Sequence, residues 1–448
     1  CDVFELQEDI LRGALYGTLT VYDTQDIRSI LPLTGLERLS VKFNTPGMPG
    51  YDMTEDNGTP FHIYKVDNVT KVLDKDKAQY YQIHFCSPEF IQSQLETVSR
   101  AYAGPIENAV NDIVKKKLKS KKPFFFENTA TNAKYVIPSM KPLNAIKFLS
   151  HQCVSGKYNN AGYLFYETKK GFQFRSLESM MALNGSQARE HSLAFQTQVV
   201  MKHDMPRKFK KDLTKQSEIM DIETRMRTVI KYDFDKHADT LGNIMGGMYA
   251  NRLVVHDAFN KTIKTHDFNY IEDFAKGFHT ETTGFANDSE KHVLPNAKLG
   301  DTNAGLHEYP NSKKMVVTET SKVHNDYEFV PTKETLPKII SQRKGMQSLN
   351  LTLTVYGNTL LNAGDVIYFN APLMRPGDEE EENPFISGRY LVIAIKHIAT
   401  LETQTHEMVI RCMKDSVRTP YPSESDPLIV GKDKSSVKNI YEQDVADI

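Results

Sequence analysis

The chain has 448 residues, of which 40% are hydrophobic and 25% charged, and its formal net charge is −2. This balance excludes a strong field over the whole molecule that would favour nucleic acid or a membrane surface. At roughly 100–200 residues per domain, the length predicts about three domains. No run of about 18 apolar residues and no signal peptide occurs, which predicts that no helix spans a membrane. Because the chain opens at Cys1 within strand-like sequence, we expect a few residues to precede it.

Residues 1–87 predict an antiparallel β-barrel. Apolar and polar side chains alternate at 18–22, 39–43 and 81–85, and this period of two is typical of half-buried strands. The segment 45-TPGMPG-50 predicts a turn between strands, because proline and glycine interrupt regular structure.

Residues 88–235 predict helices, an α+β module and a connecting segment. Ser87-Pro88 favours the start of a helix, and the apolar spacing continues through Ile91, Leu95 and Val98. A second helix is expected after Gly104-Pro105, ending in the basic run 115–122, which we interpret as a solvated helix end. The module at 123–180 combines a helix that carries Leu143, Ile146 and Leu149 with a hairpin, 162–174, that turns at Thr168–Gly171.

Residues 236–415 predict a second barrel that an insertion divides. Residues 236–264, with a strand at 248–257, form its first part, and residues 346–415 form the remainder. The polar stretch 265–345 between them predicts an irregular insertion. Residues 349–355 show the clearest strand alternation in the chain, and 416–448 predict an extended C-terminal arm.

The two predicted barrels resemble each other as an internal repeat. Segment 39–47 matches 365–373, segment 61–70 matches 389–400, and segment 80–86 matches 407–413, with a nearly constant spacing between the copies. The first strand, 15–23, matches 248–257 at a shorter spacing. The difference between the two spacings indicates an insertion of about 93 residues in the second copy.

No motif for catalysis or metal binding is present. GxSxG, Walker, GxGxxG and HExxH patterns are absent, and we expect no enzyme activity, catalytic residue, cofactor or metal. The pairs His256-Asp257 and His266-Asp267 lie on an expected hairpin without a third ligand. Cys1, Cys86, Cys153 and Cys412 are too scattered for a zinc site or a disulfide scaffold and predict buried thiols. The acidic run 378-DEEEEN-383 predicts a solvated loop tip.

Four segments resemble the baseplate hub subunit of T-even-like contractile-tailed bacteriophages, and related hub regions of other phage tails and type VI secretion spikes. They are 87–118, 142–153, 162–180 and 387–397, of which 142–180 is the most specific. The fold class that follows is β-rich α+β, with two tube-protein-like antiparallel β-barrels per chain, an α+β module and an irregular insertion.

The resemblance implies a structural protein of the virion tail baseplate, assembled in the bacterial host cytoplasm. A homotrimer would present six similar barrels to the sixfold tail tube and threefold symmetry to the central spike. The implied partners are the tail tube protein, the central spike protein and baseplate wedge proteins. The tape-measure protein and DNA would pass through the lumen without sequence-specific binding. The alternatives are a hub that also cleaves peptidoglycan and a hub that binds the host surface through residues 265–345.

Overall fold

The structure is a computed structural model. It describes residues 2–30, 33–45, 50–56, 59–72, 78–130, 132–158, 160–182, 199–202, 229–236, 238–257, 260–274, 276–281, 305–319, 332–371, 383 and 385–417. Residues 46–49 of the turn predicted at 45–50, the acidic residues 378–382 and the arm beyond 417 lie outside the described residues.

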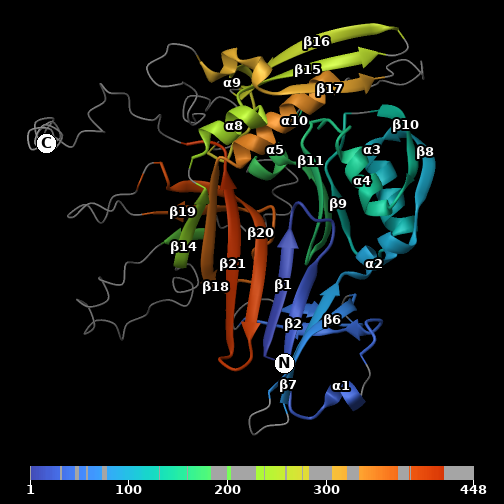
Figure 1. Ribbon diagram of the computed structural model, residues 1–448, viewed down its shortest axis with the longest axis vertical. Helices are drawn as coiled ribbons and strands as arrows, with labels where there is room; N and C mark the ends of the chain where they lie inside the picture. The colour runs from blue at the N-terminus through green and yellow to red at the C-terminus, as the bar shows by residue number, and fades with distance from the viewer. Residues whose placement is uncertain are drawn as a thin grey trace, which may run out of the picture.

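One 11-stranded sheet runs through the molecule (Figure 1). Its path is β14-β18-β21-β20-β1-β2-β7-β6-β3, with β19 paired to β20 and β13 paired to β19. Every pair is antiparallel except β13 with β19. The strands are β1 (Val3–Asp9), β2 (Tyr16–Asp23), β3 (Arg38–Leu39), β6 (Phe61–Val72), β7 (Ala78–Cys86), β13 (Val199–Lys202), β14 (Val229–Lys236), β18 (Leu349–Tyr356), β19 (Val366–Asn370), β20 (Gly388–Thr400) and β21 (Thr405–Lys414).

The expected strands of both barrels are present, but the described pairings form one open sheet. They do not close either copy into a barrel, so closed barrels are not confirmed. The hydrophobic core of the first copy includes Leu6, Tyr51 and Phe85. Beside it lie the short helix α1 (Ile27–Ile30) and the pair β4 (Val41–Phe43) and β5 (Tyr51–Met53).

The α+β module follows the first copy and confirms its main expected elements. Helix α4 and the hairpin of β11 with β12 lie where the sequence predicts them. Its elements are α2 (Pro88–Leu95), β8 (Val98–Pro105), α3 (Ile106–Asp112), the π-helix η1 (Ile113–Lys117), β9 (Phe124–Phe126), β10 (Asn132–Met140), α4 (Pro142–Ser150), β11 (Tyr163–Thr168), β12 (Gly171–Ser176) and α5 (Leu177–Met181).

Helix α2 is shorter than the apolar spacing predicts. It begins after Ser87, as expected, but Glu96 is extended and Val98 opens strand β8. Leu95, assigned to the apolar face of the helix, is exposed, whereas Val98 is buried in the module core. The third apolar residue of the pattern therefore belongs to the strand that pairs with β10.

The region expected to be irregular, 265–345, contains regular structure. Strands β15 (Ala250–Asp257), β16 (Thr262–Asn269) and β17 (Lys314–Glu319) form a separate sheet, which lies with helix α10 (Thr332–Met346) above the main sheet (Figure 1). The remaining elements are α8 (Thr240–Gly246), α9 (Tyr270–Phe274), η3 (Leu306–Glu308) and η4 (Pro310–Ser312). Most residues of β16 are exposed, so the alternation that reveals a half-buried strand is missing.

The strand expected at 248–257 is present as β15, but its place in the second copy is wrong. β15 pairs with β16 and β17 and with no strand of the main sheet. The position next to β18 is occupied by β14, nearly all of which lies in the region 88–235 that was predicted to end in a connecting segment. The second copy is therefore interrupted between β14 and β18, by residues 237–348.

Candidate assembly interface

The two copies repeat one order of strands. The first copy runs β3-β6-β7-β2-β1, and the second runs β19-β20-β21-β18-β14. The residue registers agree with the spacing predicted for the repeat: Val66 pairs with Ile83, and Ile395 pairs with Ile410. The predicted repeat is confirmed for β6 with β20 and for β7 with β21. The predicted match of 15–23 with 248–257 is wrong, because β2 corresponds to β18.

A shared irregularity supports the same equivalence. In β6 the register against β7 shifts between Ile63 and Lys65, and in β20 the register against β21 shifts between Val392 and Ala394. The two shifts are separated along the chain by the same spacing as Val66 and Ile395. A β-bulge at the same point of both copies is a specific structural feature, because bulges bend a strand and fix its register.

The register also identifies β14 as the counterpart of β1. Phe4 pairs with Leu19 in the first copy, and Tyr232 pairs with Leu353 in the second. The next residues of these strands, Glu5 and Asp233, also correspond. Glu5 pairs with Thr18, and Asp233 pairs with Thr352.

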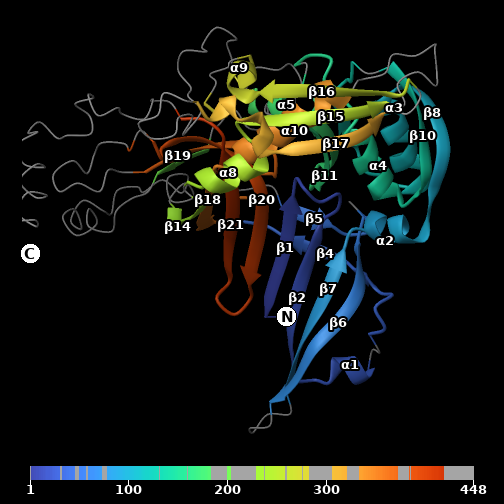
Figure 2. The ribbon, with the colours of Figure 1, turned by 45° about the horizontal axis from the view of Figure 1, so that its top comes forward.

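The copies meet at a junction between β1 and β20 (Figure 2). Pairing runs from Val3 with Thr400 to Asp9 with Ala394, and Ile10 N–H donates to the Ile393 carbonyl at 3.0 Å. Glu5 and Lys396 form an ion pair across it at 2.7 Å. The junction thus joins one segment near the start of the chain and one near its end into a single sheet.

Among the described residues, two of the long strands of the main sheet, β14 and β6, have an unpaired side. β14 pairs on one side only, with β18. β6 pairs with β3 only at Phe61 and His62, Ile63 N–H donates to the Glu37 carbonyl, and Gly35 lies against the backbone of Tyr64. Beyond Lys65, the outer side of β6 has no described strand partner. Unpaired edges of this length invite pairing with another chain.

The face of the main sheet opposite the apolar cores carries mostly polar side chains along both copies, with the apolar Val3, Ile398 and Val409 among them. Because directly paired residues share a face, the registers place the following side chains together: Glu5, Gln7, Thr18, Thr20, Lys65, Asp67, Gln82, His84, Asp233, Thr352, Thr354, Lys396 and Arg411. All are at least partly exposed. Both charge signs are interspersed on this face.

Glu8 is a buried carboxyl group at the point where the first copy, the module and the second copy meet. It accepts hydrogen bonds from Lys169 N–H in the β11–β12 turn and from Ala363 N–H before β19, at 3.2 and 3.1 Å. Burial raises the pKa of Glu8 to about 7, against the lowering effect of these two donors. No local pattern in the sequence distinguishes this glutamate, because its partners come from remote segments.

We expect Glu8→Gln to make stability less dependent on pH. The folded pKa lies above the unfolded value of 4.5, so the unfolded state ionises first and stability falls as pH rises from about 4.5 to 7. A pKa shift of this size corresponds to a change of about 3 kcal/mol in the free energy of unfolding. Urea unfolding at pH 5 and pH 8 measures it: the wild type should lose stability over this interval and the variant much less. An equal loss in both proteins would contradict the assignment.

Lys122, the last residue of the basic run, departs from the predicted solvated helix end. Its Nζ lies 2.7 Å from Glu89 and 2.5 Å from Glu167, and all three side chains are largely buried. Glu167 also accepts from Leu15 N–H at 3.0 Å. The ion pairs therefore join α2 to the module hairpin, and the hydrogen bond from Leu15 joins the hairpin to the β1–β2 turn. Lys115 and Lys116 are exposed as predicted.

The other candidate residues form no recognisable chemical centre in the described residues. His256 and His266 lie on the predicted hairpin, where Asp267 instead forms an ion pair with Arg252 at 2.6 Å. Within the described ranges, no three His, Cys, Asp or Glu side chains are arranged to hold a metal ion. Cys86, Cys153 and Cys412 are buried free thiols, as predicted, and burial raises the pKa of each. No described helix is long and apolar enough to cross a membrane.

Comparison with known proteins finds similarity in structure. No family model matches the chain, and no curated protein matches it at a significant level. A tail protein from Neisseria meningitidis MC58 is similar over 92% of each chain at 8% identity, with a TM-score of 0.50. The 43 kDa tail protein of prophage MuSo2 from Shewanella oneidensis has a TM-score of 0.48, at 8% identity over 92% of this chain and 94% of that chain.

A third similar structure is the E. coli c3393 protein, described as a component of the type VI secretion system that resembles the T4 bacteriophage tail proteins gp27 and gp5. It is 9% identical over 95% of this chain and 76% of that chain, with a TM-score of 0.42. The similarity to the Neisseria tail protein shows a shared fold.

Proposed function

We propose that this chain is a structural hub subunit of a phage tail baseplate and acts as a homotrimer. The observation that carries the proposal is the repeated order of strands with its internal β1·β20 junction. The fold shared with the Neisseria tail protein supports a role in a tail. A chain that contains the same unit twice supplies six units from three copies, which suits a joint between sixfold and threefold parts.

The repeat itself indicates how the copies would join. β14 corresponds to β1, and β6 corresponds to β20. The β1·β20 junction repeated between chains is therefore a pairing of β14 of one protomer with β6 of the next. Three such contacts would pair the open edges of three chains and close a ring of six units.

The polar face of the sheet would line the lumen of this ring. Its charges of both signs give little reason for DNA to adhere, because adhesion to phosphate needs an excess of positive charge. The lumen would pass the genome and the tape-measure protein without sequence-specific binding.

The proposed partners are the tail tube protein on the pseudo-sixfold side, the central spike protein on the threefold side, and baseplate wedge proteins. The proposed location is the tail baseplate of the virion. The proposed role is structural rather than enzymatic; clearing of a peptidoglycan gel by the purified chain would contradict that part.

Native mass spectrometry of the purified chain tests the proposal. We expect a species at three times the chain mass of 51.0 kDa. A monomer at every concentration, both alone and with a tail tube or spike partner, would contradict the proposed trimer.

A further inference from the structure

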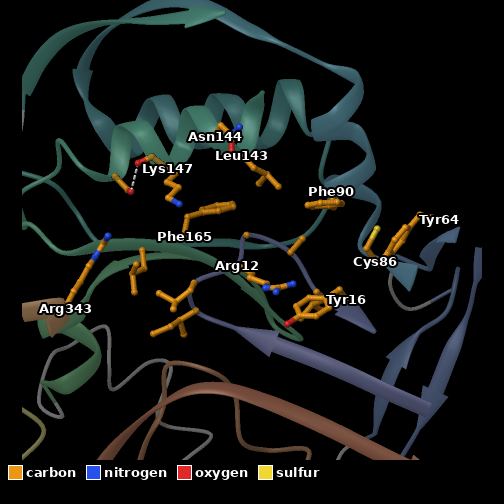
Figure 3. Close-up of a pocket in the computed structure, with 17 residues that line it drawn as sticks. Arg12, Tyr16, Tyr64, Cys86, Phe90, Leu143, Asn144, Lys147, Phe165 and Arg343 are labelled. Carbon is orange, nitrogen blue, oxygen red and sulfur yellow. Dashed lines mark hydrogen bonds between the residues drawn. The ribbon is translucent and has the colours of Figure 1, made fainter. Parts of the chain in front are cut away.

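A pocket of about 610 Å³ lies between the first copy and the module (Figure 3). The β1–β2 turn forms one wall, with Leu11 and Arg12, and α4 forms another, with Leu143. Tyr64 of β6 and Phe90 of α2 lie together at one end, as Figure 3 shows. The volume is in the range of sites that bind a ligand or an anchoring side chain.

The Tyr64 end of this pocket carries exposed apolar side chains. Tyr64 is 46% exposed and Phe90 41% exposed. The backbone of Tyr64 lies against Gly35, whose neighbour Leu36 is 84% exposed. Clustered exposure of large apolar groups marks a surface that another protein covers.

The junction between repeats indicates which segment would reach this surface. In the β1·β20 junction, the residue that follows β1, Ile10, meets Ile393 at the bulge of β20. The counterpart of Ile393 is Tyr64, at the bulge of β6. In the proposed trimer, the segment that follows β14 of one protomer would therefore lie beside Tyr64 of the next.

That segment is α8 (Thr240–Gly246), which exposes apolar side chains of its own. Leu241 is 70% exposed and Met245 64% exposed. They are four residues apart, so they lie on the same face of the helix.

We propose that α8 of one protomer covers the Tyr64–Phe90 end of the pocket of its neighbour. Leu241 and Met245 pack against Tyr64, Phe90 and Leu36, so the pocket is completed only by a second copy of this chain. The inference depends on the proposed trimer and adds to the β14·β6 pairing a contact between side chains. This is helix-in-groove recognition, in which residues spaced i and i+4 supply the anchors.

Leu241→Asp tests this contact, with Ile263→Asp as the matched control. Ile263 is 71% exposed on β16 and has no place in the proposed contact. By sedimentation equilibrium, we expect Leu241→Asp to weaken trimer formation by at least about tenfold. The control should assemble like the wild type, and both variants should melt like the wild type under monomeric conditions.

Phe90→Asp, on the opposite side of the contact, should weaken the trimer as Leu241→Asp does. If the wild type forms a trimer and both variants form it with the same affinity, the α8 contact is overturned and the proposed trimer stands. A monomeric wild type would overturn both proposals. Equal weakening by Ile263→Asp would also overturn the contact, because the effect would then not be specific to α8.

Discussion

Val66→Pro is expected to leave the chain folded and to abolish its trimer. Val66 is the counterpart of Ile395. The Ile393 carbonyl faces β1, because it accepts a hydrogen bond from Ile10 N–H. Along an antiparallel strand, every second residue directs its N–H and C=O to the same neighbour. Ile395, two residues after Ile393, therefore directs its N–H at β1. The Val66 N–H therefore points to the open edge, where proline costs no ladder bond within the chain. Between chains, one hydrogen bond of about 1 kcal/mol is lost at each of the three junctions. This loss alone lowers the equilibrium constant of trimer formation roughly hundredfold, and a steric clash of the proline ring with the neighbouring strand would add to it.

Val66→Ala is the matched control, because it shortens the same partly buried side chain but keeps the N–H. Native mass spectrometry measures assembly, and circular dichroism shows whether each variant is folded. A folded proline variant that still forms the trimer would contradict the open edge of β6 as the contact.

Leu353→Asp is expected to unfold the second copy and prevent assembly. Leu353 is fully buried at the centre of the second core, on the strand with the clearest alternation in the sequence. An unpaired carboxylate at this position should cost about 3–5 kcal/mol, by analogy with broken buried ion pairs.

Thr354→Asp is the control for this prediction. Thr354 is the next residue of β18 and lies on the polar face, so its replacement should change the free energy of unfolding by less than about 1 kcal/mol. Urea unfolding followed by circular dichroism compares the two variants. Similar stability of Leu353→Asp and the wild type would contradict the placement of this strand.

The parts of the fold predicted well are those whose residues alternate between core and surface. Leu353 and its neighbours in β18 show this pattern, as do Ile83 and Phe85 in β7. The predicted match between Val66 and Ile395 also holds in the strand registers, because both strands contain the same bulge and bury the same face.

The parts predicted poorly depend on contacts between remote segments. Residues 250–257 alternate like a strand of the repeat, but local pattern does not determine which strand they pair with. Helix α10 contains Pro337 and lies in polar sequence, which conceals it. The junction residue Glu8 and the ion-paired Lys122 acquire their significance only when segments far apart in the chain meet.

A disulfide cross-link tests the ring most directly. Asp233 of β14 corresponds to Glu5, and Thr70 of β6 corresponds to Ile398, which pairs with Glu5 in the internal junction. The double variant Asp233→Cys with Thr70→Cys should therefore give covalent dimers and trimers on a non-reducing gel after mild oxidation. The control Glu5→Cys with Ile398→Cys should cross-link only within one chain. Cross-linked trimers from the first variant are the result expected of a ring of six units; a variant that stays monomeric while its control cross-links would contradict it.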